Sequence, residues 1–390
     1  MQIDALKQKI IAAKTSLGID KIGFTTAAPF RHLAAGLKMQ KAKEYTSGFE
    51  HQVLAQRLYP QRIFDHPQSI IAIALAYPSK LPFKVPHDRQ QPRGRFARAS
   101  WGLDYHQILR DKMQQLINFI KANIDAEAHF KAMVDTGELI DVAVAQRAGL
   151  GFIGRNGLLI TQEFGSFVYL GEIITDIPFT PDQPMANQCG TCTRCIDRCP
   201  SQALLGNGHL NAQRCLSYQT QTKGIMAAEF RPKIRNVIYG CDVCQLVCPF
   251  NRGKAVDGHV QMQPQLDEAA PKLKQLLTIS NQEFREQFGQ LAGAWRGKKP
   301  LQRNAIIVLA NLGDRSAIPL LLKLSEQDVR PIIRATAIWA LAKLAKDNKT
   351  AIVAFLKQCQ QVENDAQVQQ SLQAALKRIR GKELNSHKIS

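Results

Sequence analysis

The sequence predicts an α+β domain, then a small cysteine-rich domain, then an all-α region of stacked helices. Apolar, strand-like runs alternate with helical stretches in the first half of the 390 residues, and eight of the nine cysteines fall between 189 and 248. Alanine- and leucine-rich segments recur near the end of the chain. Residues 256–290, polar and proline-containing at their start, are expected to be a connector. A chain of this length holds two or three domains.

Residues 1–180 form the expected α+β domain. Runs such as "SIIAIALAYP" (69–78) and "FVYLGEIITDIPF" (167–179) are typical of buried strands. The first twenty residues are amphipathic and lack the apolar core and cleavage site of a signal peptide. No stretch reaches the roughly 18 apolar residues of a membrane span. We therefore expect a cytoplasmic protein without a membrane partner, in which clustered cysteines bind metal more often than they form disulfides.

Residues 181–255 carry two cysteine runs with iron–sulfur spacing. The first is C-x2-C-x2-C-x3-C-P, the bacterial ferredoxin pattern for a 4Fe–4S cluster, and the second, C-x2-C-x3-C-P, lacks a cysteine that Cys215 can supply. Zinc also uses C-x2-C pairs but does not need the further cysteines, and a disulfide framework is the other alternative. Cys359, in an apolar helical pattern, is expected to be a buried small hydrophobe. Because the cysteine before proline ligates the other cluster in two-cluster ferredoxins, the predicted ligands are Cys189, Cys192, Cys195 and Cys248 for one cluster, and Cys199, Cys215, Cys241 and Cys244 for the second.

Residues 291–390 are expected to form HEAT-like repeats. The segments "NAIIVLANLGD" (304–314) and "TAIWALAKLAKD" (336–347) align at a period of 32 residues, and a weaker copy, "SLQAALKRIRG", follows at 371–381. This period is typical of stacked helix pairs. An ordinary amphipathic bundle is the alternative.

The same region carries an excess of positive charge. The chain has a net charge of +19, and residues 291–390 contain 17 Lys and Arg against 7 Asp and Glu, a surplus of +10. A solvated charged face is the usual interpretation of one basic run, but this surplus on a repeat scaffold favours nucleic acid. A membrane surface is disfavoured because no amphipathic anchor with bulky apolar residues is present. The densest patch is "WRGKKPLQRN" (295–304), in which Lys298, Lys299 and Arg303 are the predicted contacts.

Several segments, spread along nearly the whole chain, carry a family resemblance. They are the two cysteine runs, "GLDYH" (102–106), "DTGELIDVAVAQRAGLGFIGRNGLLI" (135–160), "GSFVYLGEIITDIPF" (165–179), "RCLSYQTQTKG" (214–224), "YGCDVCQLVCPFNRGK" (239–254) and "WRGKKPLQRNA" (295–305). In this order they resemble the epoxyqueuosine reductase family. One departure is Arg155, where the family usually has lysine; the positive charge is kept, but the side-chain geometry differs.

The resemblance implies an enzyme that removes the epoxide oxygen of epoxyqueuosine at the wobble position of tRNA, the last step in making queuosine. Members carry cobalamin and two 4Fe–4S clusters. Their N-terminal domain is an α+β cobalamin-binding fold similar to that of nitroreductases, and their HEAT-like repeats help to hold the tRNA. The resemblance also implies base-off cobalamin without a protein histidine, so His106 is given no ligand role. We further expect a low-potential electron donor and a monomeric enzyme.

Asp135, in "MVDTGEL", is the predicted proton donor. Reducing an epoxide to an alkene consumes two electrons and two protons and releases water. The clusters pass single electrons, and reduced cobalamin is suited to attack carbon. Burial beside an apolar corrin face would raise the pKa of Asp135 and keep it protonated near neutral pH. The alternative is that Asp135 only caps the helix "GELIDVAVAQRAG"; the resemblance favours the acid.

Arg57, Ser217 and Gln245 are the predicted cofactor contacts. Arg57, in "AQRLYP", resembles a family position near the cofactor; Ser217 and Gln245 lie beside cluster cysteines, with loop hydrogen bonding as the alternative. Residues 104–106 fit a helix start and packing equally well. Two other functions are weighed. A reductive dehalogenase-like enzyme would not need a basic repeat region, and an electron-transfer module would leave the first 180 residues without a role.

Overall fold

The computed structural model describes residues 3–346 and 348–386, and the chain divides into two compact units. The chain passes between the units several times. The cysteine-rich segment, residues 181–255, contributes to both units. The four consecutive segments expected from the sequence stay predictions. Unit 1 consists of Met1–Pro82, Arg98–Tyr218 and Asp242–Pro264, and unit 2 of Phe83–Ala97, Gln219–Cys241 and Gln265–Ser390.

An antiparallel sheet of four strands forms the centre of unit 1. Its order is β1-β2-β7-β4, and the central pair β2 and β7 runs in register from Ser69 opposite Thr175 to Ala76 opposite Val168. Every residue of β2 is buried. Burial of both faces explains why the two strand-like runs of the sequence show no polar alternation. The strands are β1 (Lys21–Thr26), β2 (Ser69–Ala76), β4 (Phe130–Met133) and β7 (Val168–Thr175).

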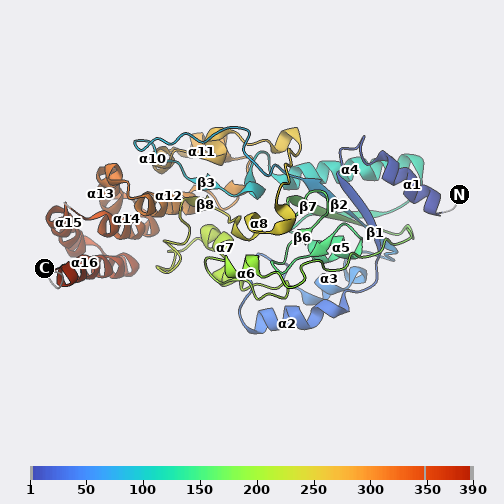
Figure 1. Cartoon of the computed structure of the whole chain (residues 1–390), viewed down its shortest axis with the longest axis horizontal. Coiled ribbons are helices and arrows are strands. Elements are labelled where there is room, and N and C mark those ends of the chain that lie inside the picture. Colours follow the sequence, from blue (N-terminus) through green and yellow to red (C-terminus); the bar gives the residue numbers. More distant parts are fainter. Residues whose placement is uncertain (1–2, 347, 387–390) are drawn as a thin grey trace. The chain divides into compact units, whose positions relative to one another are not determined.

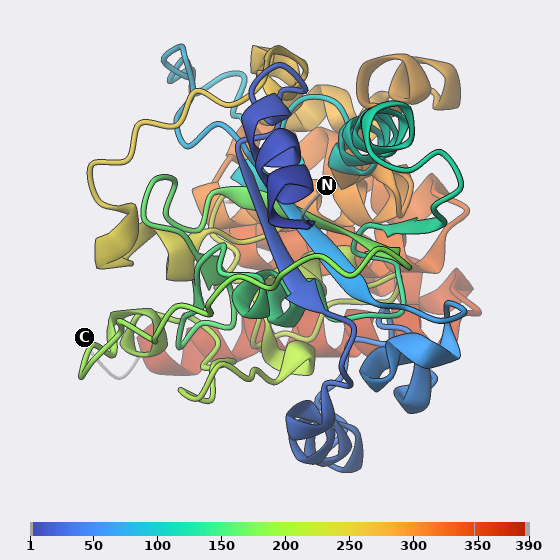
Figure 2. The ribbon, with the colours of Figure 1, turned by 90° about the vertical axis from the view of Figure 1, so that its right-hand side faces the viewer.

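Helices cover both faces of this sheet (Figures 1 and 2). Ile71 and Ile73 belong to one apolar core with residues of α1 and α4, and Ile70 and Ala72 belong to a second core with residues of α5. Successive residues of β2 thus supply opposite faces, as the strand period requires. The helices are α1 (Ile3–Ala13), α2 (Ala34–Ala42), α3 (Leu54–Leu58), α4 (Tyr105–Asn123) and α5 (Asp141–Arg147).

The cysteine runs are built from short elements. Each run contains one four-residue helix, and these two helices, α6 and α8, contact each other. A small hairpin, β5 with β6, precedes them in the chain. The bounds are β5 (Phe152–Ile153), β6 (Leu159–Ile160), α6 (Arg194–Asp197), α7 (Leu216–Gln221) and α8 (Val243–Leu246).

Unit 2 consists of a short parallel strand pair, β3 with β8, and a series of helices. The three repeated segments of the sequence fall in α12, α14 and α16, which pack in this order, so the predicted helical repeat is confirmed; residue 347, at the end of the second segment, lies outside the described residues. No helix among the described residues is long and apolar enough to cross a membrane. The bounds are β3 (Arg95–Phe96), β8 (Val237–Tyr239), α9 (Leu266–Ala269), α10 (Leu273–Thr278), α11 (Asn281–Phe288), α12 (Lys298–Leu312), α13 (Ile318–Gln327), α14 (Pro331–Leu344), α15 (Lys349–Val362) and α16 (Ala366–Ser386).

Candidate active site and cluster-binding site

Asp135 lies on a strained loop between β4 and α5. Its φ is +47°, in the left-handed region that residues other than glycine seldom adopt. The backbone N–H of Asp135 donates a hydrogen bond to Asp141 Oδ2 at 2.9 Å. The Asp135 side chain is 59% exposed. The loop therefore presents a carboxylate to the surface, and Asp141 holds the backbone behind it.

The helix-cap alternative for Asp135 is wrong. Helix α5 begins at Asp141, and Ile140 occupies its N-cap position without a side-chain hydrogen bond. Asp135 lies six residues before the start of the helix. Its positive φ also differs from the extended backbone of an N-cap residue.

Two side chains at the start of α4 reach Asp135. The Tyr105 hydroxyl donates to Asp135 Oδ2 at 2.7 Å, and His106 Nε2 lies 3.5 Å from the same oxygen. On its other side, His106 Nδ1 lies 2.7 Å from Asp104 Oδ1. Asp104 also caps α4 by accepting from the backbone N–H of His106, which confirms the predicted helix start. Tyr105 and His106 therefore belong to the Asp135 site, a role that was not predicted from the sequence.

These neighbours decide the charge of Asp135. Partial burial opposes a charge on His106, but hydrogen bonding to Asp104 and Asp135 raises the pKa of His106 to about 9. The same contact with His106 lowers the pKa of Asp135 against the effect of burial, and Tyr105 lowers it further. At neutral pH the proton therefore resides on His106, and Asp135 is ionised. In this structure the hydrogen-bond donors of Asp135 outweigh burial. The expected rise of its pKa beside a corrin face stays a prediction.

Two further carboxyl groups neighbour the Asp135 loop: the partly buried Asp141 and the buried Glu172. Glu172, in the central strand β7, is 1% exposed. Burial raises the pKa of Asp141 to about 7 and that of Glu172 well above its ordinary value, and repulsion from neighbouring carboxylates adds to both shifts. Such a pair shares a proton rather than carrying two charges. The available signal in the sequence was one acidic residue, Glu172, inside an otherwise apolar strand run.

Four predicted cluster ligands line one pocket of unit 1, here called the cysteine pocket: Cys189, Cys192, Cys195 and Cys248. Burial raises the pKa of Cys195, and the neighbouring Cys248 and Cys189 raise it further. No three His, Cys, Asp or Glu side chains in the described part of the chain converge closely enough for a single metal ion.

The predicted ligands of the second cluster are placed in part. Burial raises the pKa of Cys215, and the nearby Cys199 raises it further, so these two thiols are neighbours in unit 1. Cys244 lies in α8 of the same unit, and Cys241 ends the Gln219–Cys241 segment of unit 2. Cys359, as expected, is a buried residue of α15.

Three further predicted contacts lie in unit 1. Burial lowers the pKa of Arg57, and Glu50 and Asp141 partly oppose this, so Arg57 lies near the acid behind the Asp135 loop. The amide nitrogen of Gln245, which is 6% exposed, donates to the Tyr77 hydroxyl at 2.9 Å and is held by this bond. Ser217 is a partly buried residue of α7. As cofactor contacts, Arg57, Ser217 and Gln245 stay predictions.

The basic segment 296–303 divides into exposed and buried residues. Lys299 is exposed, and Lys298 is partly buried, with its Nζ donating to the Ile279 carbonyl at 3.1 Å. Arg303 is 0% exposed, and burial lowers its pKa to about 10. The prediction that Arg303 contacts nucleic acid is therefore wrong, because a fully buried guanidinium cannot reach a phosphate. It donates instead to backbone carbonyls of Gln219 (2.7 Å), Thr220 (3.3 Å), Thr222 (2.8 Å) and Gly224 (2.6 Å).

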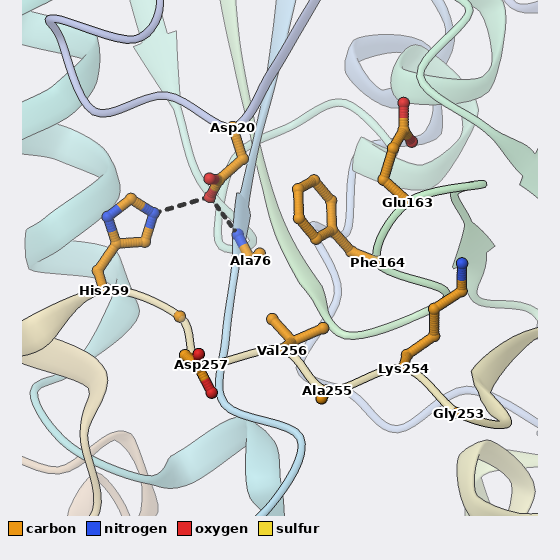
Figure 3. A pocket seen from close by; sticks show the side chains of 11 residues that line it. Asp20, Ala76, Glu163, Phe164, Gly253, Lys254, Ala255, Val256, Asp257 and His259 are labelled. Carbon is orange, nitrogen blue, oxygen red and sulfur yellow. Dashed lines mark hydrogen bonds and ion pairs between the residues drawn. The ribbon is translucent and has the colours of Figure 1, made fainter.

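A polar cavity of about 310 Å³ in unit 1 contains none of the predicted site residues (Figure 3). In this cavity Asp20 Oδ2 accepts from the Ala76 backbone N–H at 2.7 Å and lies 2.7 Å from His259 Nε2. These contacts attach the segment that follows the second cysteine run to the end of β2. The polar contacts in this cavity therefore have a structural role in joining segments of unit 1.

Family models match three parts of the chain. The model described as "4Fe-4S double cluster binding domain" matches residues 188–251, and "HEAT repeats" matches residues 290–377. Residues 57–136 match "Epoxyqueuosine reductase QueG, DUF1730". The double-cluster and HEAT matches confirm two parts of the predicted fold class and favour clusters over zinc. Fold and site together define an iron–sulfur oxidoreductase with a helical-repeat region.

Named relatives of the chain are also epoxyqueuosine reductases. The chain is 52% identical over 371 residues to an epoxyqueuosine reductase of Listeria monocytogenes, covering 95% of this chain and 97% of that protein. It is similar to a crystal structure of epoxyqueuosine reductase with an epoxyqueuosine-modified tRNA-Tyr stem loop, with a TM-score of 0.93, 47% identity and coverage of 97% and 100%. A Bacillus subtilis epoxyqueuosine reductase with its catalytic loop swung out of the active site gives a TM-score of 0.93, 46% identity and the same coverage. The chain belongs to the epoxyqueuosine reductase family.

Proposed function

We propose that Asp135 delivers a proton to the epoxide oxygen when this enzyme reduces epoxyqueuosine in tRNA. The reaction converts an epoxide to an alkene, consumes two electrons and two protons, and releases water. The observation that carries the proposal is the exposed Asp135 carboxylate in contact with the Tyr105 hydroxyl and close to a protonated His106. This arrangement supports an acid that can be reprotonated by the neighbouring imidazolium of His106.

The proton path runs along these side chains. Asp135 gives its proton to the substrate oxygen as the carbon–oxygen bond breaks, and the imidazolium of His106 supplies that proton to Asp135. The 3.5 Å between His106 Nε2 and Asp135 Oδ2 closes to a hydrogen bond with a small shift of either side chain. Tyr105 fixes the carboxylate by donating to the same oxygen. The hydrogen bond from the Asp135 backbone N–H to Asp141 holds the loop in its strained backbone conformation.

The residues of the site fit the cofactors that the family resemblance implies. The cysteine pocket fits one 4Fe–4S cluster, and Cys199, Cys215, Cys241 and Cys244 would hold the second. Both ring nitrogens of His106 face carboxylates, which fits base-off cobalamin without a ligand from this histidine. Arg57, Ser217 and Gln245 would contact the cobalamin. When bound, cobalamin and the clusters supply the two electrons at low potential.

The substrate and partners follow from the same proposal. Lys298 and Lys299, at the start of α12, would contact tRNA phosphates, which is supported by the family structure with a tRNA stem loop. An enzyme that acts on tRNA would work in the cytoplasm. A low-potential donor would recharge the clusters, and the enzyme would act as a monomer.

Asp135→Ala and Asp135→Asn test the proton donor in single-turnover conversion of epoxyqueuosine by chemically reduced enzyme. A general acid contributes about 10²–10⁴-fold, so we expect both variants to lose activity in this range while keeping iron, cobalamin and tRNA binding. Asparagine keeps the shape of the side chain but has no carboxylic proton.

Asp111→Asn, at an exposed position of α4, is the matched control and should convert substrate at the wild-type rate. Near-normal conversion by Asp135→Asn would show that the carboxyl proton is not needed.

A further inference from the structure

The turn between β5 and β6 places an amide side chain in the cysteine pocket. Asn156 is 5% exposed and lines this pocket. Its Nδ2 atom is buried and has no hydrogen-bond partner among the described residues. An unpaired buried N–H group costs free energy and is uncommon in folded proteins. Asn156 therefore has a donor to offer to a group bound in the pocket.

The turn fixes which end of the amide is available. Asn156 Oδ1 accepts a hydrogen bond from the backbone N–H of Leu158 at 3.3 Å. Exchanging the two ends of the amide would set donor against donor at Leu158, so the nitrogen is the end directed away from the turn. Gly154 makes this packing possible, because a Cβ at that position would lie 2.7 Å from Asn156 Oδ1.

The pocket offers few side-chain acceptors. Ile160, Pro249 and Phe250 contribute apolar side chains, and the guanidinium of Arg155 is only a donor. The remaining lining side chains are the four predicted ligand cysteines. The cysteine sulfurs are thus the side-chain acceptors among the residues that line the pocket with Asn156.

We infer that Asn156 donates an N–H···S hydrogen bond to the 4Fe–4S cluster held in the cysteine pocket and thereby raises its reduction potential. Reduction adds negative charge to the cluster, and a donor aimed at its sulfurs stabilises that charge. Asn156 is in this sense a tuning residue for one cluster of the two. The inference rests on the proposed ligand assignment, which iron content tests separately.

The test is a redox titration of the anaerobically purified enzyme with both clusters, followed by electron paramagnetic resonance. We expect two midpoint potentials in the wild type. In Asn156→Leu one of them should fall by the equivalent of roughly a tenfold change in the reduction equilibrium, which is about 59 mV for a one-electron couple. The other potential should not move.

Asn156→Asp keeps an acceptor for the Leu158 N–H but removes the donor, so it tests the inference even if the leucine variant loses its iron. Its cluster should also shift to lower potential. Ile160→Val, which changes an apolar side chain in the same pocket, is the matched control and should leave both potentials unchanged. Wild-type potentials in an iron-replete Asn156→Asp or Asn156→Leu protein would overturn the inference, and so would an equal shift of both clusters.

Discussion

The cysteine pocket of unit 1 and the basic segment of unit 2 were both predicted as binding sites from short motifs, with different outcomes. In the cysteine pocket, the structure brings together four cysteines that the ferredoxin spacing had grouped, although Cys248 lies far along the chain from the other three. In the basic segment, by contrast, Lys299 is exposed and Arg303 is fully buried.

The difference follows from what each motif specifies. Cysteine spacing is a geometric requirement of the ligand, so it carries information about where the side chains point. A run of positive charges specifies only composition. On a helix, Lys299 and Arg303 lie four residues apart, but the guanidinium of Arg303 satisfies backbone carbonyls of the preceding Gln219–Cys241 segment. Charge in a sequence therefore predicts a polyanion partner without identifying the contact residues.

The largest expected effect is the loss of iron when a predicted ligand cysteine is replaced. Wild-type enzyme purified without oxygen should contain about eight irons per chain, from two cubanes. Cys215→Ala should lose roughly one cluster, and Cys248→Ala should lose the other, with iron measured by chemical assay. Cys359→Ala, a buried cysteine of α15 outside both runs, is the control and should keep all its iron. Full iron content in Cys215→Ala would show that the ligand assignment is wrong.

The second prediction concerns Arg303 as a structural residue. Arg303→Met keeps much of the side-chain volume but leaves several buried carbonyls without a donor. Hydrogen bonds to a charged group contribute about 1.5–3 kcal/mol each, so we expect a loss of at least about 3 kcal/mol of stability. Thermal unfolding followed by circular dichroism should show a clearly lower Tm. An unchanged Tm together with weakened tRNA binding would instead return Arg303 to the binding surface.

The smallest effect is expected at Lys299. Lys299→Gln removes one exposed charge, so tRNA affinity should fall by less than about tenfold, and the slope of log K against log salt should decrease by about 0.7–0.9. Filter binding at several salt concentrations measures both quantities. Lys9→Gln, an exposed position of α1, removes the same charge from unit 1 and serves as the control. If both variants lose the same affinity, the effect is one of net charge and not of a contact at Lys299.

Much of the fold could be predicted from the sequence because its signals are local. The apolar runs that became β2 and β7 and the repeats in α12, α14 and α16 depend on periodicity alone. The boundaries of the two units could not be predicted, because each unit is assembled from three segments that are separated in the sequence.

The charge of Asp135 could not be predicted from the sequence. The resemblance identified Asp135, but the charge of this residue depends on Tyr105, thirty residues earlier, and on its neighbour His106. The sequence alone does not show these hydrogen bonds, which lower the pKa of Asp135 in this structure. The pKa of Glu172 likewise depends on a neighbour, Asp141, whose position the sequence does not show.

The protonation of His106 tests the account most directly, because the proposed path requires His106 to hold the proton beside an ionised Asp135. The measurement is a pH titration of the His106 ring by nuclear magnetic resonance on the oxidised enzyme, assigned with a His106→Gln variant. A raised pKa keeps the imidazolium charged at neutral pH, so the signal should titrate near pH 9 in the wild type, and single-turnover conversion should decline as pH rises through that value. In Asp135→Asn the pKa should move down toward the ordinary value of about 6.5. A wild-type pKa already near that ordinary value, or one that does not change in Asp135→Asn, would contradict the account.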